Sequence, residues 1–438
     1  MTARQAAFLS LQKFEKDGKY SNIELSASIE KYGLSGVEKA FYTALLYGVI
    51  ERKITLDRMI SLLSERAPEN IDRDVKAALY IGLYQLYFMD KVPDSAAVNE
   101  SVSLLTRFSA KKNSEAFANA VLRRAAREKD RNYLPNRKDN ETEYLSVKYS
   151  VPEWICKKWI CELGAEKAEK CLELTLSHPH MTVTVNTLRC SRDEFIKMLS
   201  EAGIKCEPTA LSPRGVKMTE NVPYEKLIPF EKYFFVQDEA SQLCGEVLGM
   251  EKGESLLDAC ACPGGKSFYS AIRAENCGRI LSRDLHKNKL SLVKSGAERL
   301  GTDIIETKVQ SAAVPSDDGE KFDRVLCDVP CSGLGVMAKK PEIRYKSEEE
   351  TLRLPMLAFD ILSSCSESVK DGGVLVYSTC TVSKEENEDV VKRFLSANKD
   401  FVPERFSVGE LCSDGICTIL PCDYGCDGFF IAKMRKIK

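Results

Sequence analysis

Five apolar runs in the second half of the chain constrain the fold more than any other feature. Stretches with helical periodicity separate them. Apolar runs of this length, spaced by helices, are typical of a mainly parallel sheet with helices on both faces. They therefore predict an α/β doubly wound, Rossmann-like domain over residues 236–438. The runs are SLLDAC (255–260), RILSRD (279–284), FDRVLCDV (322–329), GGVLVYST (372–379) and GFFIAKM (428–434).

The first part of the chain has a different pattern. Residues 1–128 carry apolar residues at spacings of three and four, as in EKAFYTALLYGVIERKITLDRMISLL (38–63), which predicts an all-α bundle. Residues 129–144 are polar and aperiodic and are predicted to be a linker. Between 145 and 235, helical stretches alternate with short strands such as MTVTVNTL (181–188), which predicts a small α+β module. We therefore expect a multidomain protein.

The composition places the chain among soluble globular proteins, with 44% apolar and 29% charged residues. No stretch is long and apolar enough to span a bilayer, and the amino terminus has no secretory core, so we expect a cytoplasmic protein without a membrane partner. The net charge of −2 does not by itself indicate nucleic acid. Basic residues are concentrated locally instead, in RRAAREKDR (123–131), KKPEIRYK (339–346) and KMRKIK (433–438).

The seventeen cysteines suggest a reducing compartment, because no export signal accompanies them. Four of them lie close together near the carboxyl terminus, but they lack the CxxC pairs that zinc sites prefer. Ordinary packing is the favoured interpretation, and no metal is expected. These four are Cys412, Cys417, Cys422 and Cys426.

The loop CACPGGKS (260–267) follows the first apolar run and precedes a helical stretch. Its glycines allow the backbone to approach a ligand closely, and the helix start offers free N–H groups. A P-loop is excluded, because Cys260 stands where that motif needs glycine. The loop predicts nucleoside binding, with a plain strand-to-helix connection as the alternative. Asp284 ends the next strand, where a ribose acceptor belongs, although a helix N-cap explains an aspartate there equally well.

Two thiols and one carboxylate follow the ends of later strands. Asp328 and Cys331 stand in DVPCSG, and Cys380 follows VLVYST. A single cysteine at a strand end is usually a small apolar residue. The carboxyl ends of parallel strands share one edge of the sheet, where ligands bind. The sequence therefore predicts a functional site at this edge.

These segments resemble a known family. DACACPGGK, DVPCSG and YSTCTVSKEENE are similar to motifs of cytosine-5 RNA methyltransferases that use S-adenosylmethionine (SAM), in particular the Sun/Fmu-type bacterial enzymes acting on 16S ribosomal RNA. FFVQDEASQL (234–243), PEIRYKSEEE (341–350) and DGFFIAKM (427–434) resemble further family segments. The helical amino terminus, with VPDSAAVNESV and FANAVLRR, resembles the NusB-like RNA-binding domain that part of the family carries. The small module then corresponds to an RRM/ferredoxin-like domain.

The resemblance implies a role for each residue at the sheet edge. Cys380 becomes the nucleophile that adds to C6 of a cytosine, Asp328 the partner of the N3 and amino edge of the base, and Cys331 the residue linked to product release. Lys266 and Arg344 are the candidate cations for ionising Cys380. The implied SAM site includes Asp284 at the ribose, Asp328, and Gln310, which stands where the family has an acid near the adenine. The methionine end would lie along Cys260, Ala261, Cys262, Pro263, Gly264, Gly265 and Lys266.

The implied partner is RNA, with 16S ribosomal RNA expected first and transfer RNA as the alternative. A non-catalytic RNA-binding assembly factor is the alternative from a different class of function. No DNA is expected, and a monomer is expected.

Overall fold

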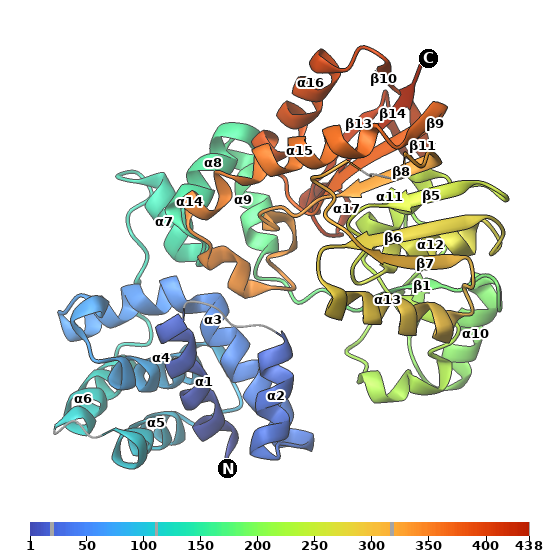
Figure 1. Cartoon of the computed structure of the whole chain (residues 1–438). Helices are drawn as coiled ribbons and strands as arrows, with labels where there is room; N and C mark the ends of the chain where they lie inside the picture. The colour runs from blue at the N-terminus through green and yellow to red at the C-terminus, as the bar shows by residue number, and fades with distance from the viewer. Residues whose placement is uncertain (18–21, 110–112, 316–318, 438) are drawn as a thin grey trace. The chain divides into compact units, whose positions relative to one another are not determined.

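The computed structural model describes residues 1–17, 22–109, 113–315 and 319–437 (Figure 1). The chain divides into two compact units, of which the first comprises 1–177 and 337–346 and the second the remainder. The domain boundaries predicted from the sequence follow a different division and stay a prediction. Within the described ranges, no helix has the length and apolar character needed to cross a membrane.

The first unit is helical, as the apolar spacing of residues 1–128 predicts. The middle of its core is α4, which is apolar on nearly all sides and begins where the Asp72 side chain accepts a hydrogen bond from the Asp74 N–H. Three further helices follow the bundle in the same unit. The helices are α1 (Ala3–Asp17), α2 (Asn22–Tyr32), α3 (Gly36–Ser64), α4 (Arg73–Phe88), α5 (Asp94–Phe108), α6 (Ser114–Arg127), α7 (Glu141–Tyr149), α8 (Glu153–Leu163) and α9 (Ala165–Leu174), with a 3-10 turn η1 (Pro68–Asn70).

Part of the predicted linker is anchored on the bundle. Tyr133 is buried against the apolar core of the first unit, and its hydroxyl lies 3.0 Å from that of Tyr87. The two rings meet edge to face. The sequence did not predict that Tyr133 is buried, because a single buried tyrosine in a polar segment produces no periodic apolar pattern.

The second unit begins with a small antiparallel sheet in the order β2-β3-β1-β4. Its helix α10 starts at a capping box formed by Ser191 and Glu194. Val183, Val185 and Phe195 form part of the core between this helix and the sheet. The elements are β1 (Thr182–Val185), α10 (Arg192–Glu201), β2 (Cys206–Pro208), β3 (Gly215–Met218), η2 (Tyr224–Lys226), η3 (Ile228–Phe230) and β4 (Phe234–Val236).

The larger sheet has the order β10-β14-β9-β8-β5-β6-β7, with β13 paired to β14. The five strands from β9 to β7 are parallel, and β14 is antiparallel to β9. The doubly wound, mainly parallel sheet predicted from the sequence is therefore confirmed (Figure 1). The strands are β5 (Ser255–Asp258), β6 (Arg279–Asp284), β7 (Ile305–Val309), β8 (Phe322–Asp328), β9 (Val369–Thr379), β10 (Phe401–Pro403), β13 (Ile416–Ile419) and β14 (Phe429–Lys436), with a separate pair β11 (Phe406–Val408) and β12 (Leu411–Ser413).

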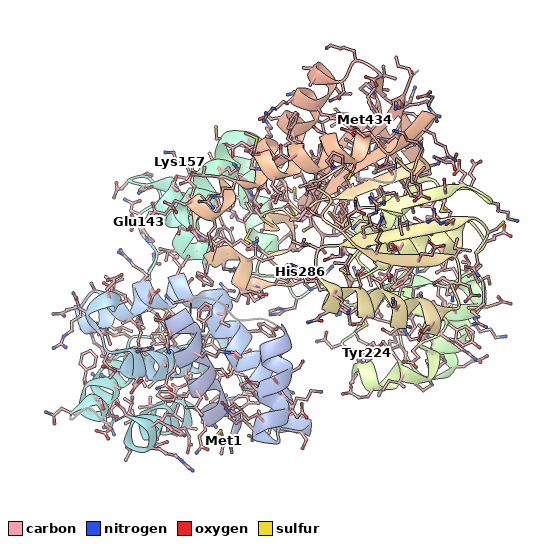
Figure 2. The ribbon with its side chains drawn as sticks, in the orientation of Figure 1. Met1, Glu143, Lys157, Tyr224, His286 and Met434 are labelled. Atoms are coloured by element: carbon pink, nitrogen blue, oxygen red, sulfur yellow. The ribbon has the colours of Figure 1, made fainter. Side chains whose placement is uncertain are left out.

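Both faces of this sheet are buried, which explains why its strands are continuously apolar. Along β9, Val374 and Val376 join one core cluster, and Leu375 and Tyr377 join the cluster on the opposite face. Met434 of β14, labelled in Figure 2, is also fully buried. The remaining helices of the second unit are α11 (Glu239–Leu248), α12 (Gly265–Arg273), α13 (Lys287–Leu300), α14 (Glu348–Thr351), α15 (Leu354–Ser366), α16 (Glu388–Ala397) and α17 (Pro421–Tyr424), with the 3-10 turns η4 (Leu334–Val336) and η6 (Lys384–Glu386). The 3-10 turn η5 (Pro341–Tyr345) belongs to the first unit.

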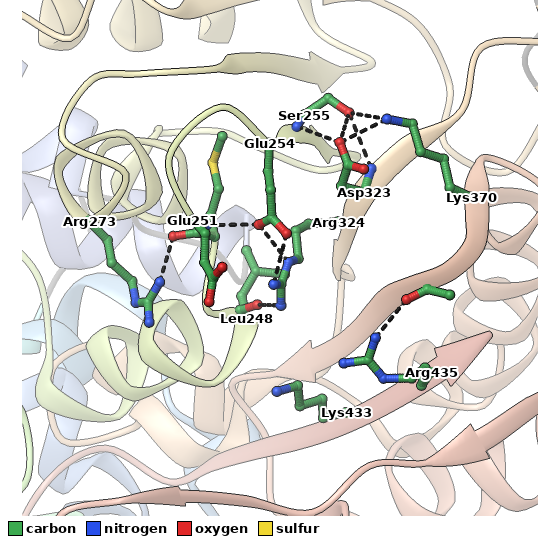
Figure 3. A network of polar contacts seen from close by, with 12 residues as sticks. Leu248, Glu251, Glu254, Ser255, Arg273, Asp323, Arg324, Lys370, Lys433 and Arg435 are labelled. Atoms are coloured by element: carbon green, nitrogen blue, oxygen red, sulfur yellow. Dashed lines mark hydrogen bonds and ion pairs between the residues drawn. The ribbon is translucent and has the colours of Figure 1, made fainter. Parts of the chain in front are cut away.

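Ion pairs and hydrogen bonds tie the strands together at their amino ends (Figure 3). Asp323 accepts hydrogen bonds from Ser255 Oγ at 2.6 Å and from Lys370 Nζ at 2.8 Å. Arg324 binds both carboxylate oxygens of Glu254, at 2.9 and 3.0 Å. Burial alone would raise the pKa of Asp323, but the hydrogen bonds from Lys370 and Ser255 lower it to about 2. These contacts fix the strand register at the edge opposite the candidate site.

Candidate functional site

The two thiols predicted at the sheet edge lie against each other. β8 and β9 are parallel neighbours, and their register places Asp328 beside Ser378. The loop after β8 and the residue after β9 therefore meet at the carboxyl edge. Cys331 Sγ and Cys380 Sγ are 3.3 Å apart, and the two cysteines are not joined by a disulfide. This is hydrogen-bond contact between sulfurs, well beyond a disulfide length of about 2.05 Å.

The surroundings of Cys331 favour its protonated form. The hydrogen bond with Cys380, burial, and the negative charge of Glu386 together raise the pKa of Cys331 well above its ordinary value. Cys331 therefore keeps its proton at neutral pH, and its S–H is placed to donate to Cys380. Because a donor stabilises an anionic acceptor, this arrangement favours the thiolate at Cys380.

The Asp328 carboxylate is held from both sides. Lys266 Nζ donates to Asp328 Oδ2 at 2.7 Å, and Ser378 Oγ donates to Asp328 Oδ1 at 2.7 Å. Burial alone would lower the pKa of the Lys266 ammonium, but the neighbouring carboxylate reverses this and raises the pKa above its ordinary value. The Lys266 ammonium also lies 5.2 Å from the centre of the Phe429 ring. Lysine and aspartate thus form a charged pair at the same edge as the thiols.

Arg344, the other cation considered for Cys380, is used elsewhere. It belongs to the segment 337–346 of the first unit and is completely buried. Its guanidinium donates to the carbonyl oxygens of Pro341, Glu51, Ser150 and Thr175 at 2.8 to 3.1 Å. These four carbonyl oxygens satisfy the buried guanidinium, so its charge needs no carboxylate partner. Arg344 therefore has a structural role in the first unit. Of the two cations considered, Lys266 is the one placed among the site residues.

The glycine loop connects β5 to α12. Gly264 has φ +114°, and a Cβ there would lie 2.4 Å from the Phe268 ring, so only glycine is tolerated. Ala261 N donates to Arg283 O at 2.8 Å, which joins the loop to β6. Gly265 begins α12, and the exposed Pro263 lies two residues before it. The loop therefore presents its backbone at the carboxyl edge of the sheet.

The cysteines of this loop are unsuited to nucleophilic chemistry. Burial raises the pKa of Cys260 well above its ordinary value. Burial, with the hydrogen bond and charge of Asp284, raises the pKa of Cys262 to about 12. Both thiols are therefore neutral at physiological pH, which disfavours them as nucleophiles.

Asp258, at the end of β5, is a site residue that the sequence analysis did not select. It is 1% exposed, and its Oδ2 accepts a hydrogen bond from Ser267 Oγ at 2.6 Å. Its other oxygen, Oδ1, is buried and has no partner among the described residues. Burial raises the pKa of Asp258 to about 6, although the hydrogen bond from Ser267 acts in the opposite direction. The sequence offered one indication of this role, because Asp258 is a carboxylate at the end of the strand that precedes the glycine loop.

Asp284 and Gln310 lie together at the ends of β6 and β7. Gln310 N donates to Asp284 O at 3.1 Å, and the side-chain oxygen of Gln310 is buried without a partner in the described parts of the chain. Asp284 is not the N-cap of α13, which is His286, an exposed residue labelled in Figure 2. The Asp284 carboxylate instead accepts the His286 N–H at 2.9 Å.

Two exposed apolar residues flank this pair and were also not selected from the sequence. Leu285 is 62% exposed and Val309 is 51% exposed. Exposed apolar side chains next to unpaired polar groups are typical of small-molecule sites. No sequence signal separates them from other apolar residues at strand ends.

The site holds no recognisable metal centre in the ranges described. No group of three or more His, Cys, Asp or Glu side chains there is arranged to hold a metal ion. The four carboxyl-terminal cysteines are distributed over β12, β13 and the region around α17.

Three family models match consecutive parts of the chain. Residues 1–127 match the NusB family, 151–225 the ferredoxin-like domain of RsmF/B-like methyltransferases, and 246–435 the 16S rRNA methyltransferases RsmB/F. These matches confirm the order of a helical NusB-like region, a small antiparallel module and a methyltransferase fold.

Similar proteins extend over the full length. A probable ribosomal RNA small subunit methyltransferase B of Bacillus subtilis (strain 168) is 35% identical, with 99% of both chains covered. A protein of the same description from Synechocystis sp. is 33% identical, with 100% of both covered. The crystal structure of PH0851 has a TM-score of 0.81 at 26% identity and covers 99% of this chain and 98% of that chain. This chain therefore belongs to the RsmB/F family of 16S ribosomal RNA methyltransferases.

Proposed function

We propose that this protein transfers a methyl group from SAM to C5 of a cytosine in 16S ribosomal RNA, through a covalent bond between Cys380 and C6. The observation that carries the proposal is the 3.3 Å contact between Cys331 and Cys380 at the edge that also presents Asp328. Membership of the family supports RNA as the substrate class and methyl transfer as the reaction.

The C5 atom of cytosine is a weak nucleophile and does not attack the methyl group of SAM unaided. A nucleophile must therefore first add to C6 of the ring. Addition of the Cys380 thiolate to C6 converts the ring to an enamine-like form whose C5 is nucleophilic. As the thiolate adds, N3 takes up a proton from solvent, and the Asp328 carboxylate is assigned to accept hydrogen bonds from this N3–H and from the amino group. C5 then takes the methyl group from the SAM sulfonium, which leaves as the neutral thioether S-adenosylhomocysteine. Loss of the C5 proton to solvent and of the proton on N3 allows the C6–S bond to break, which restores the aromatic ring and returns Cys380 as a thiolate. We assign Cys331 to this release step.

Three polar groups support SAM as the methyl donor. SAM supplies an electrophilic methyl group bound to a sulfonium. The unpaired Gln310 oxygen suits the amino group of adenine, and the unpaired Asp258 oxygen suits the ammonium of the methionine end. Asp284 is assigned to the ribose hydroxyls, with Leu285 and Val309 as apolar contacts of the base. The backbone from Cys260 to Lys266 is assigned to the methionine portion.

Replacing Asp258 by asparagine is expected to weaken SAM binding and to stabilise the second unit at neutral pH. Binding should weaken at least about tenfold, because a hydrogen bond to a charged group is lost. Since the pKa of Asp258 is about 6, above the ordinary aspartate value, the folded chain keeps a proton that the unfolded chain releases between about pH 4 and 6. Stability therefore falls as the pH rises through this interval. The variant avoids that loss and should gain about 2 kcal/mol at pH 8 and almost nothing at pH 4.

Calorimetry with SAM and denaturant unfolding at pH 4 and pH 8 measure the two effects. Asp303→Asn, at an exposed aspartate, is the matched control and should change neither. A stability difference that does not depend on pH would contradict the assignment of the raised pKa to Asp258. Unchanged SAM affinity would remove Asp258 from the cofactor site.

The reaction is tested by the identity of the methylated nucleoside. The protein is incubated with methyl-labelled SAM and either 16S ribosomal RNA or transfer RNA, and the RNA is digested and analysed by mass spectrometry. We expect label in 5-methylcytidine from 16S ribosomal RNA. Label in transfer RNA alone would favour the alternative substrate, and label in another nucleoside would exclude the cytosine-5 mechanism.

A non-catalytic assembly factor remains the alternative function. It predicts no label with either RNA, together with tight RNA binding. The paired thiols disfavour it, because RNA binding alone gives no reason to hold two reactive sulfurs in contact beside a charged lysine–aspartate pair.

A further inference from the structure

A buried carboxylate lies behind the two thiols and bonds to the loop that carries Cys331. Glu386, on η6, is 3% exposed. Its Oε2 accepts the backbone N–H of Ser332 at 2.7 Å. Ser332 directly follows Cys331, so this bond acts one residue from the thiol. A hydrogen bond to an ionised acceptor is stronger than one between neutral groups, which makes it an effective anchor for a loop.

A second set of bonds ties the same loop to the residues after Cys380. Ser332 Oγ and Thr381 Oγ1 lie 2.8 Å apart, and both side chains are completely buried. Asn387, next to Glu386, accepts from Thr379 Oγ1 at 2.6 Å and donates to Thr381 O at 3.0 Å. The backbone of Cys380 also takes part, since Gly335 N donates to Cys380 O at 3.0 Å.

Glu386 itself is fixed from the strand side. The Tyr377 hydroxyl donates to the Glu386 backbone carbonyl. The turn that carries the carboxylate is therefore attached to β9, three residues before Cys380. The bonds that Asn387 and Tyr377 make on the Cys380 side do not use the Glu386 carboxylate, so they are kept when it is deleted. The Ser332 N–H, by contrast, loses its acceptor while remaining buried.

We propose that Glu386 is a positioning residue for Cys331, and that it acts on the release step rather than on formation of the Cys380 adduct; this inference rests on the proposed function. Loss of the carboxylate moves Cys331 away from Cys380 and from the bound base. The negative charge beside Cys331 also helps to keep that thiol protonated while Cys380 attacks. A misplacement of a fraction of an ångström is sufficient to slow a step that depends on alignment.

The test compares covalent RNA adducts in four variants of the full-length protein, after incubation with 16S ribosomal RNA and SAM. Glu386→Ala is expected to raise the adduct fraction on denaturing gels about tenfold or more and to lower kcat by a similar factor, with little change in KM for RNA. Glu386→Gln keeps an acceptor for Ser332 N and should recover most of kcat. Glu385→Ala removes a neighbouring but exposed carboxylate and should behave as the unmodified protein. Cys331→Ala is the reference for a blocked release step.

The outcomes separate this inference from the proposed function. An adduct with Cys331→Ala but none above background with Glu386→Ala would overturn the inference and leave the proposed function intact. No adduct with Cys331→Ala would contradict the release role of Cys331 itself. If Glu386→Ala does not fold, Glu386→Asp provides the second test, because it keeps the charge while a shorter side chain withdraws it from Ser332 N. An adduct with Glu386→Asp supports positioning, and its absence overturns it.

Discussion

The Cys331→Ala variant is expected to accumulate a denaturation-resistant adduct with 16S ribosomal RNA, whereas the Cys380→Ala variant is expected to form none. The reason is that Cys380 is assigned to formation of the covalent adduct and Cys331 to its release. Without Cys380 no C6–S bond forms. Without Cys331 the bond forms and methyl transfer proceeds, but release is blocked. Methyl incorporation should fall by at least about a thousandfold in Cys380→Ala, the size of effect seen when a covalent nucleophile is removed.

Denaturing gels of each variant with RNA and SAM measure the adduct, and nucleoside analysis measures the methyl group. Cys277→Ala is the matched control, because Cys277 is an exposed thiol away from the site, and it should behave as the unmodified protein. An adduct seen only with Cys380→Ala would reverse the two roles. An adduct with neither variant, and no methyl incorporation by the unmodified protein, would favour another RNA or the assembly-factor alternative.

Asp328→Asn is expected to lower kcat by about a hundredfold to a thousandfold, because it removes the charged partner of the N3 and amino edge while keeping the size of the side chain. It should also destabilise the second unit by about 3 kcal/mol. The second effect arises because the Lys266 side chain is only 11% exposed and loses the carboxylate that neutralises its charge. Single-turnover methyl transfer and denaturant unfolding measure the two losses.

A double variant separates the two roles of Asp328. Lys266→Met combined with Asp328→Asn removes the unpaired ammonium, so stability should return to within about 1 kcal/mol of the unmodified protein. Activity should stay low, because the base still lacks its charged partner. Recovery of activity together with stability would show that Asp328 contributes only by neutralising Lys266, and would contradict its assigned contact with the base.

Full-length similarity to small-subunit ribosomal RNA methyltransferases supports the reaction class and the RNA class. The roles of the individual residues do not follow from that similarity. They depend on the contacts between Cys331, Cys380, Asp328 and Lys266, which the variants above address one at a time.

The sequence by itself determined the architecture of the second unit, because each central strand is buried on both faces and must be apolar throughout. Val374 to Tyr377 alternate between two core clusters, and that burial is visible as an uninterrupted apolar run. The sequence also predicted that one edge of the sheet carries Asp328, Cys331 and Cys380, because neighbouring parallel strands have their carboxyl ends on the same side. The helical first 128 residues were equally predictable, because apolar spacing of three to four is a local property.

Only the tertiary structure decided which side chains touch. Strand order and register place Asp328 beside Ser378 and bring the two sulfurs to 3.3 Å, and both depend on pairings between residues about fifty positions apart. The same long-range packing buries Asp258 and raises its pKa. It also places Arg344 in the first unit, although Arg344 was one of the two candidate cations for Cys380. Glu386 is the clearest case. Three glutamates, Glu385, Glu386 and Glu388, follow the strand that ends before Cys380, and the bond from Ser332 N to the buried carboxylate distinguishes Glu386 from the other two. Local patterns specify elements and edges, whereas contacts between distant segments arise only when the whole core is packed.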